Sequence, residues 1–302
     1  MHKIDRRNFI KQTAAAGVAV SALSQTRYVT GKESPDLAVA QNASPAELVR
    51  QVVDMLGGMS RFVKEGQKVF LKPNIGWDRL PEQAADTNPE AVGEVVRMCK
   101  EAGADKIRIV DRTCNQARRC YKRSGIEEAA KEAGAEVRHI IDSRFKETRI
   151  PNGKLVNSWP IYKDALEFDV FINMPIAKVH SISRVTLGMK NMLGVLGGNR
   201  GALHKDFHQK IVDINSVLRP DLTIIDAYRI MVANGPSGGN LEDVETPKVM
   251  IAGTDPVAVD TYAVSLFDIN PKEMGYLVNA HEQGLGEIDL SKLNISKHDF
   301  SA

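Results

Sequence analysis

The sequence has few aromatic residues, few cysteines and no long, strongly apolar segment. Phe, Trp and Tyr make up 6% of the 302 residues, so a nucleic-acid reader built on stacked aromatic rings is not expected. The three cysteines are fewer than the four that ligate a ferredoxin-type cluster. A membrane-spanning helix needs about 20 strongly apolar residues, and no such run occurs. The chain is therefore expected to lack an iron–sulfur motif, a nucleic-acid partner and a stable membrane span.

The glycine-rich segments do not match a nucleotide-binding fingerprint. The segment "GVLGGNRGALH" contains no G-x-G-x-x-G, so a dinucleotide-binding loop is not expected. Its glycines instead indicate a flexible site loop, or a place where backbone approaches a ligand closely. The segment "NGPSGGN" is interpreted as a turn-rich loop, with a binding loop as the alternative.

The N-terminal residues are typical of an export signal. The basic start "DRRNFIK" precedes an uncharged run of small and apolar residues over 12–25, the layout of a secretory signal peptide. The paired Arg6 and Arg7 resemble a twin-arginine signal. We therefore expect residues 1–30 to be a twin-arginine-type signal peptide, cleaved within residues 22–28. An uncleaved anchor and a disordered basic tail are the alternatives.

The charge balance agrees with this interpretation. The formal net charge is +2, and residues 1–24 alone carry +3, so the remainder is close to −1. The basic balance thus reflects the signal and not a polyanion-binding surface. The expected partners are the twin-arginine translocation machinery and a small ligand. The expected location is periplasmic or otherwise extracytoplasmic, where Cys114 and Cys120 form a disulfide, stay free thiols or bind a metal.

Strand-like and helix-like patterns alternate over residues 44–302. The buried strand pattern "QKVFLKPNI" is followed by a helix pattern that Asn88 caps and Pro89 begins. This alternation predicts an α/β fold, a mainly parallel sheet flanked by helices in a three-layer sandwich. A β-hairpin insertion is expected over 146–162. Residues 31–43 are polar and are interpreted as a linker.

Polar side chains follow several predicted strands at the same end. In an open α/β sheet, ligands bind beyond the carboxyl ends of the strands. One polar residue there is usually a turn former, but a succession of them predicts a shared site. The residues concerned are Lys72, Asn74, Asp111, Lys178, His180, Asp226 and Asp255.

The composition of this set favours an anionic ligand. Lys72, Lys178 and Lys190 are expected to hold a carboxylate or phosphate. Asn74 and Asn191 are expected to orient it. The alternative is that the lysines of the segment 177–194 only extend along an amphipathic helix into solvent.

Three residues are candidates for proton transfer. His180 titrates near neutral pH in its usual environment, and Asp111 and Asp226 offer carboxylates for general acid–base work.

A second cluster has the spacing of a metal site. His204 and His208 are four residues apart and would share one helix face, with Asp213 about a turn further on. Asp255 is a further candidate ligand for a hard cation. The glutamate of H-E-x-x-H is missing, and a solvated or capping histidine pair is the alternative. The cofactor stays unknown, with a divalent metal as one option.

Several segments together resemble the family called domain of unknown function 362 (DUF362). They are "VFLKPNI", "AGADKIRIVD", "NMPIAKVH", "VTLGMKNMLG", "LTIIDA" and "GTDPVAVD", and the resemblance runs from Lys68 to Tyr262. Some members of that family carry an added ferredoxin-type segment, which this chain lacks. A more distant likeness to the lactate racemase type of α/β protein points toward an anionic hydroxy acid or a bound cofactor.

The function expected from these features is binding of a small anionic metabolite or cofactor by an exported protein, with metal-assisted catalysis as an open option. A non-catalytic binding or cofactor-delivery protein is one alternative. A redox accessory protein related to the iron–sulfur members of the family is another. Whether the chain is an enzyme is left open by the sequence.

Overall fold

The computed structural model describes residues 34–301. The predicted signal peptide, 1–30, and the start of the predicted linker lie outside this range. The described residues form an eleven-stranded sheet and a separate two-stranded one. The strands of the large sheet are β1 (Leu37–Gln41), β2 (Lys68–Pro73), β3 (Lys106–Ile109), β4 (Glu136–Val137), β7 (Val170–Met174), β8 (Ile176–His180), β9 (Arg184–Thr186), β10 (Leu222–Met231), β11 (Val244–Glu245), β12 (Val249–Gly253) and β13 (Ile295–Asp299).

The large sheet is mainly parallel, as predicted. Its strand order is β13-β1-β12-β10-β7-β2-β3-β4. The neighbours from β10 to β4 all pair in parallel. The antiparallel strand β12 lies between β10 and β1, and β13 runs parallel to β1 at the edge. The carboxyl ends of β2, β3 and β7 therefore meet at one edge of the sheet.

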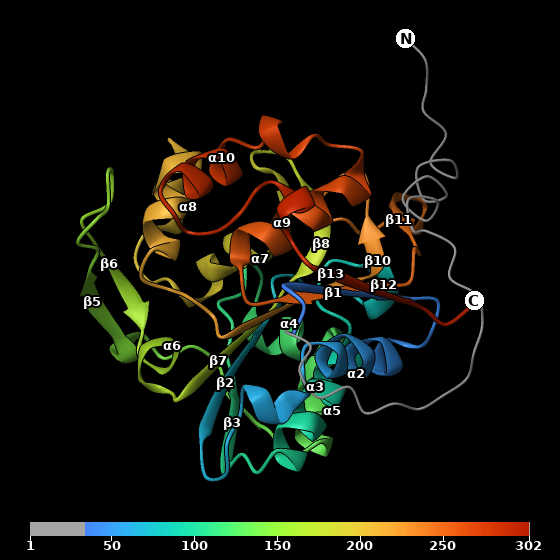
Figure 1. Ribbon diagram of the computed structural model, residues 1–302. Helices are drawn as coiled ribbons and strands as arrows, with labels where there is room; N and C mark the ends of the chain where they lie inside the picture. The colour runs from blue at the N-terminus through green and yellow to red at the C-terminus, as the bar shows by residue number, and fades with distance from the viewer. Residues whose placement is uncertain (1–33, 302) are drawn as a thin grey trace. The chain divides into compact units, whose positions relative to one another are not determined.

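Helices cover both faces of the sheet, which gives the predicted three layers (Figure 1). One buried apolar cluster joins the sheet to α2, α3 and α5 through residues such as Val52 and Val95. A second cluster joins it to α7, α8, α9 and α10 through residues such as Ile211 and Leu277. The helices are α2 (Pro45–Met55), α3 (Pro89–Glu101), α4 (Ala117–Arg123), α5 (Ile126–Glu132), α6 (Asp164–Glu167), α7 (Gly188–Asn191), α8 (Phe207–Asn215), α9 (Pro256–Val264) and α10 (Gly275–Glu282).

The longer helices begin where the sequence places a cap. Ser44 accepts a hydrogen bond from the Glu47 N–H, and the Glu47 side chain accepts one from the Ser44 N–H, which completes a capping box. Asn88 caps α3 in the same position relative to a proline. These side chains satisfy N–H groups that have no partner within the helix. The predicted start of α3 is confirmed.

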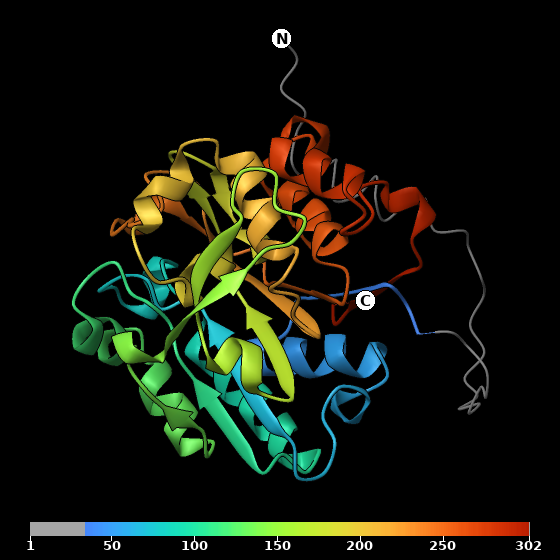
Figure 2. The ribbon, with the colours of Figure 1, turned by 90° about the vertical axis from the view of Figure 1, so that its left-hand side faces the viewer.

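The predicted hairpin is also confirmed. Strands β5 (Phe145–Arg149) and β6 (Ser158–Tyr162) pair antiparallel in their own small sheet. The pair stands at the left in Figure 1 and comes to the front in Figure 2. Phe145 packs edge-to-face on Tyr162, with ring centroids 5.3 Å apart, so the hairpin has its own side-chain contact.

One expectation about the elements is wrong. The predicted linker 31–43 contains β1, whose Leu37–Gln41 backbone pairs with β12 on one side and β13 on the other. Its four apolar residues, "LAVA", stand between polar segments in the sequence, and their partners lie more than 200 residues away. Strand β4 is limited to Glu136–Val137, because the chain then leaves the sheet for the hairpin.

Among residues 34–301, no helix is long and apolar enough to cross a membrane.

We expect β1 to be required for stability and the residues before it to be dispensable. A chain beginning at Ser34 should keep the melting temperature of the full chain. A chain beginning at Ala43 loses the buried Leu37 and Val39. Each such side chain contributes about 1.5–3 kcal/mol, so its unfolding free energy should fall by roughly 3–6 kcal/mol. Urea unfolding followed by circular dichroism measures both, and equal stability of the two chains would contradict the role of β1.

Candidate functional site

A cavity of about 350 Å³ opens at the edge of the sheet where the carboxyl ends of β2 and β3 meet β8 and α7. It combines side chains from widely separated parts of the chain with a glycine-bearing loop over 197–201. The residues around it that can carry charge or donate hydrogen bonds are Asn74, Trp77, Asp111, Arg112, Cys114, Lys178, His180, Thr186, Lys190, Asn191, Asn199, Arg200 and His204. Seven of these are site residues that the sequence predicts, so the structure brings most of the predicted site together.

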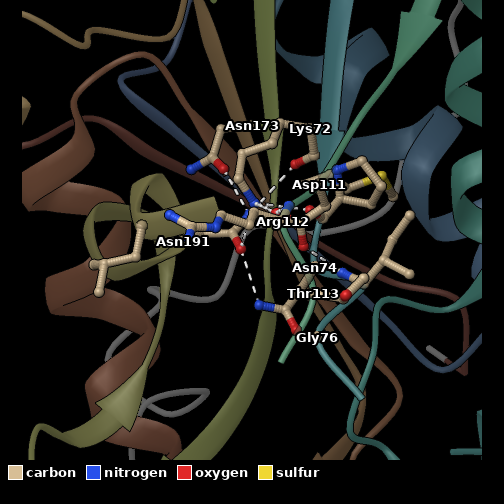
Figure 3. Close-up of polar contacts among 12 residues, drawn as sticks. Lys72, Asn74, Gly76, Asp111, Arg112, Thr113, Asn173 and Asn191 are labelled. Atoms are coloured by element: carbon tan, nitrogen blue, oxygen red, sulfur yellow. Dashed lines mark hydrogen bonds and ion pairs between the residues drawn. The ribbon is translucent and has the colours of Figure 1, made fainter. Parts of the chain in front are cut away.

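A buried ion pair lies beneath this cavity. Lys72 Nζ is 2.9 Å from Asp111 Oδ1, and the two side chains are 0% and 3% exposed. Lys72 Nζ also donates to Asn191 Oδ1 at 3.0 Å and to its neighbour's carbonyl, Pro73 O. All three side chains converge in Figure 3. Burial lowers the pKa of Lys72, and the Asp111 charge opposes that shift.

Lys72 is therefore not placed where the sequence predicts it, at a ligand in the cavity. Its ammonium is paired with Asp111 and donates hydrogen bonds to Asn191 and a carbonyl, and the residue does not line the cavity. Its role is to hold the ends of β2 and β3 together. Asp111 likewise serves the framework, because its second oxygen accepts the Ile75 N–H at 2.6 Å.

Gly194 is the position at which backbone approaches this ion pair most closely. A Cβ atom placed there would lie 1.7 Å from Asp111 Oδ1 and 2.6 Å from Lys72 Cε. Only glycine fits here, where the backbone approaches the buried ion pair; the predicted approach to a ligand stays a prediction. The Gly194 carbonyl also accepts the Arg112 N–H at 2.8 Å.

The asparagines connect the ion pair to the second lysine. Asn74 Nδ2 donates to Asn191 Oδ1 at 3.0 Å, and Asn191 Nδ2 donates to Asn173 Oδ1 at 2.9 Å. Lys178 Nζ donates to Asn74 Oδ1 at 3.2 Å and to the Ala85 carbonyl. Asn74 and Asn191 thus form a rigid polar floor (Figure 3).

Lys178 is almost fully buried, at 1% exposed. Burial lowers its pKa to about 8, while the nearby Asp86 carboxylate acts in the opposite direction. Burial also raises the pKa of Asp86 to about 7. The two acceptors and the carboxylate keep Lys178 an ammonium at neutral pH.

Lys190 has a different environment. Among the described residues its Nζ has one hydrogen-bond partner, the Thr186 hydroxyl at 3.4 Å. Burial, and next the charge of Lys178, lower its pKa to about 7. Lys190 therefore exists as both ammonium and neutral amine near physiological pH.

The short helix that carries Lys190 is fixed from three directions. Asp260 accepts the N–H groups of Gly188 and Met189 at 2.6 and 3.0 Å. Asn173 donates to the Gly188 carbonyl at 3.0 Å, and Asn215 donates to the Met189 carbonyl at 3.0 Å. The base of the Lys190 side chain is therefore held rigidly.

His180 lines the cavity, but as a neutral side chain. Burial lowers its pKa to about 3, and the charges of Lys190 and His204 add to the effect. Its Nδ1 accepts from the N–H groups of Ile182 and Ser183 at 3.1 and 3.4 Å. The proton is therefore assigned to Nε2. Contrary to expectation, His180 offers a fixed hydrogen-bond donor and not a group that titrates near neutral pH.

Asp226 does not belong to the site. It is 1% exposed, and its carboxylate accepts the N–H groups of Asn88 and Tyr228 at 2.7 and 3.0 Å. Strand β10 continues for five residues beyond it to Met231, so Asp226 is not at a strand end. Burial raises its pKa to about 6. Its contact with Asn88 anchors the start of α3.

The four candidate metal ligands are not brought together. His204 ends a 3₁₀ turn, and His208 lies in α8 after the chain reverses at Asp206, where φ is 57°. They do not share one helix face. Asp213 accepts the N–H groups of Leu155 and Val156 in the hairpin.

Asp255 caps α9 and accepts the Glu287 N–H at 2.8 Å. Over residues 34–301, no group of three or more His, Cys, Asp or Glu side chains is placed to hold a metal ion. Both aspartates were predicted as ligands because sequence spacing does not show which backbone N–H groups a carboxylate will meet.

Sequence reasoning missed the two arginines of the cavity. Arg200 donates to the carbonyls of Arg112, Leu193 and Thr113, and Arg112 donates to those of Leu196 and Gly198. Together they fasten the loop "GGNRG" over the site. The sequence does place both arginines near predicted site segments, since Arg112 follows Asp111 and Arg200 lies in the glycine-rich segment.

The cysteines are free thiols in the structure. Cys114 is exposed at the cavity and Cys120 is buried in α4, so the disulfide that the sequence left open is not formed. Cys99 lies in the apolar core, where burial raises its pKa to about 12.

The buried ion pair predicts a large, asymmetric response to mutation. Asp111→Asn leaves the Lys72 ammonium buried without its counter-charge and should lower the unfolding free energy by about 3–5 kcal/mol. The double variant Lys72→Met with Asp111→Asn should recover part of this loss, because no buried charge remains. Denaturant titration measures all three proteins. A single variant within about 1 kcal/mol of the parent would contradict the role assigned to the pair.

Three comparisons relate the chain to known proteins. The family model described as Domain of unknown function (DUF362) matches residues 69–265. The thylakoid-associated protein sll1697 of Synechocystis sp. is 26% identical over 245 residues, which are 78% of this chain and 74% of that protein.

Among solved structures, the lactate racemase apoprotein from Thermoanaerobacterium thermosaccharolyticum is similar, with a TM-score of 0.37 and 12% identity. The likeness covers 72% of this chain and 57% of that one, less than two thirds of its length, and at this level it carries no argument about ligand or reaction. The family match covers more than half of the sequence and every strand that borders the cavity, so the chain belongs to the DUF362 family.

Proposed function

We propose that this protein binds a small anionic ligand, a carboxylate or phosphate, in the cavity at the carboxyl ends of the strands. The observation that carries the proposal is Lys190. Its Nζ faces the cavity and has one weak partner, the Thr186 hydroxyl at 3.4 Å. The Lys190 side chain is half-buried at the cavity wall. An ammonium that has lost part of its hydration needs acceptors, and an anionic ligand supplies them.

The charges around the cavity support the same ligand class. Lys178, Lys190, Arg112 and Arg200 all line it, whereas Asp111 is the one lining carboxylate among the described residues. Asp111 is already neutralised by Lys72. The cavity therefore has an excess of positive charge within low-dielectric walls, where electrostatic attraction is stronger than in water.

The neutral donors define how the anion is oriented. His180 is held with Nε2–H free to donate, because Nδ1 accepts two backbone N–H groups. Asn74 and Asn191, which are hydrogen-bonded to each other, also line the cavity and can contact the anion. The volume of about 350 Å³ lies at the small end of ligand pockets, which favours a metabolite over a polymer.

We also propose that the chain is exported through the twin-arginine route and acts outside the cytoplasm. The support is the layout of residues 1–30, with Arg6 and Arg7 before an uncharged run. Export in the folded state is compatible with a site assembled from strands that are distant in sequence.

The anion site predicts a defined pH dependence. Acetate keeps its charge above about pH 6, so any change in its affinity there reports on the protein. Lys190 gains a proton as pH falls through about 7, and acetate should therefore bind more tightly at the lower pH. Lys190→Gln should weaken binding about tenfold or more and make the pH profile shallower, with the remaining dependence due to Lys178 and Asp86. Isothermal titration calorimetry measures both.

Lys131→Gln is the matched control, because Lys131 forms an exposed pair with Glu127 on α5. It should bind acetate and inorganic phosphate as the parent does. If Lys178→Gln and Lys190→Gln both left acetate and phosphate binding unchanged, the anion site would be refuted.

The export proposal is tested by the arginine pair. Arg6→Lys combined with Arg7→Lys should retain the precursor in the cytoplasm of a bacterium with a twin-arginine system, whereas Lys3→Gln should not. Cell fractionation and N-terminal sequencing of the exported protein measure this. Equal export of both variants, or an exported protein that still begins at residue 1, would argue against a cleaved twin-arginine signal.

A further inference from the structure

The three lysines of the site differ in what holds them. Lys72 is paired with a carboxylate. Lys178 donates to an amide oxygen and a carbonyl. Lys190 is held by a hydroxyl alone among residues 34–301. A hydroxyl can also donate to a neutral amine, whereas a carboxylate requires an ammonium to satisfy it. Lys190 is therefore the one whose surroundings accept an uncharged amine.

We propose that the Lys190 amine forms an imine with the carbonyl carbon of a small 2-oxo acid bound in this cavity. This inference rests on the proposed anion site and assigns its lysines different tasks. Lys178 and the His180 Nε2–H hold the carboxylate, and Lys190 is the nucleophile.

The spacing of the two lysines selects this ligand class. In the β8–β9 ladder Lys178 lies directly opposite Thr186, and such cross-strand neighbours have Cβ atoms about 4.5–5.5 Å apart. Lys190 Nζ lies 3.4 Å from the Thr186 hydroxyl. Both lysines line the same cavity of about 350 Å³, so a small ligand that reaches both carries its anionic group close to its electrophilic carbon. A 2-oxo acid has this arrangement.

The environment also supplies the neutral amine that the reaction needs. Burial and the charge of Lys178 lower the pKa of Lys190 to about 7, so a large part of it is unprotonated at physiological pH. Desolvation beside another cation is a known way to activate a lysine. The hydrogen bonds of Asp260, Asn173 and Asn215 to α7 hold the lysine's backbone in place.

The step balances without a redox partner. The amine nitrogen attacks the carbonyl carbon and forms a C–N bond. The carbonyl oxygen then leaves as water with the two hydrogens of the amine, and a C=N bond remains. External cyanoborohydride delivers a hydride to that carbon and converts the imine into a stable secondary amine.

Reductive trapping tests the inference on the intact protein. The protein is incubated with pyruvate and sodium cyanoborohydride, and the adducts are located by peptide mass mapping. We expect one reduced pyruvate adduct on Lys190, suppressed by competing inorganic phosphate. One pH unit below the pKa of Lys190, the rate should fall about tenfold from its plateau. Lys190→Arg keeps a cation but should abolish trapping, and the control Lys131→Arg should trap as the parent does.

Binding measured without the reductant separates the two proposals. If pyruvate and phosphate raise the melting temperature but no adduct forms on Lys190, the imine is refuted and the anion site stands. An adduct on Lys178, or adducts spread equally over surface lysines and unchanged in Lys190→Arg, would also refute it. If neither anion shifts the melting temperature, the anion site itself fails. Mapping in the parent protein decides the question even if Lys190→Arg does not fold.

Discussion

The buried ion pair between Lys72 and Asp111 is the interaction on which the rest of the site depends. It joins the carboxyl ends of β2 and β3, and it sets the position of the 3₁₀ turn that follows α7, since Gly194 rests against it without room for a Cβ atom. Two charges buried together are stable only when every remaining polar atom is satisfied. Asn191, the Pro73 carbonyl and the Ile75 N–H meet that requirement.

The pair also explains why the cavity above it is positive. Asp111 would otherwise be available to the lysines and arginines that line the same space. With Lys72 as its partner, it neutralises none of them, and the cations must find acceptors elsewhere. Lys178 donates to Asn74 and to a carbonyl, the two arginines donate to loop carbonyls, and Lys190 donates to a hydroxyl. Lys190 has the weakest hydrogen-bond acceptor of these cations, so it is the one most open to a ligand.

The sequence predicts the fold class and the location of the site well, because both follow from local patterns. Strand and helix periodicity, with caps such as Ser44 and Asn88, defines the layers. The rule that ligands bind beyond strand ends finds Asn74, Lys178 and His180 at the cavity. It fails at Asp226, since the strand continues through "AYRIM" and the sequence does not mark where β10 ends.

Other features depend on contacts that no local pattern contains. Strand β1 is defined by partners at the far end of the chain. Asp213 and Asp255 resemble ligands until their backbone N–H donors are known. The sequence likewise could not show that Lys72 faces a carboxylate while Lys190 faces a hydroxyl.

That last distinction matters for chemistry more than the number of lysines does. Three ammonium groups each paired with a carboxylate would be neutralised, as Lys72 is by Asp111, and would leave little positive charge for an anionic ligand. Removing oxygen acceptors from one of them, while keeping it buried beside a cation, makes its neutral form accessible at a small free-energy difference. The cavity then contains a fixed cation, Lys178, and a lysine with a lowered pKa, Lys190, whose Nζ lies 3.4 Å from the Thr186 hydroxyl. When both are protonated they attract an anion together, and when Lys190 is neutral it alone offers a free amine, so the difference between the two lysines connects anion binding with the proposed imine.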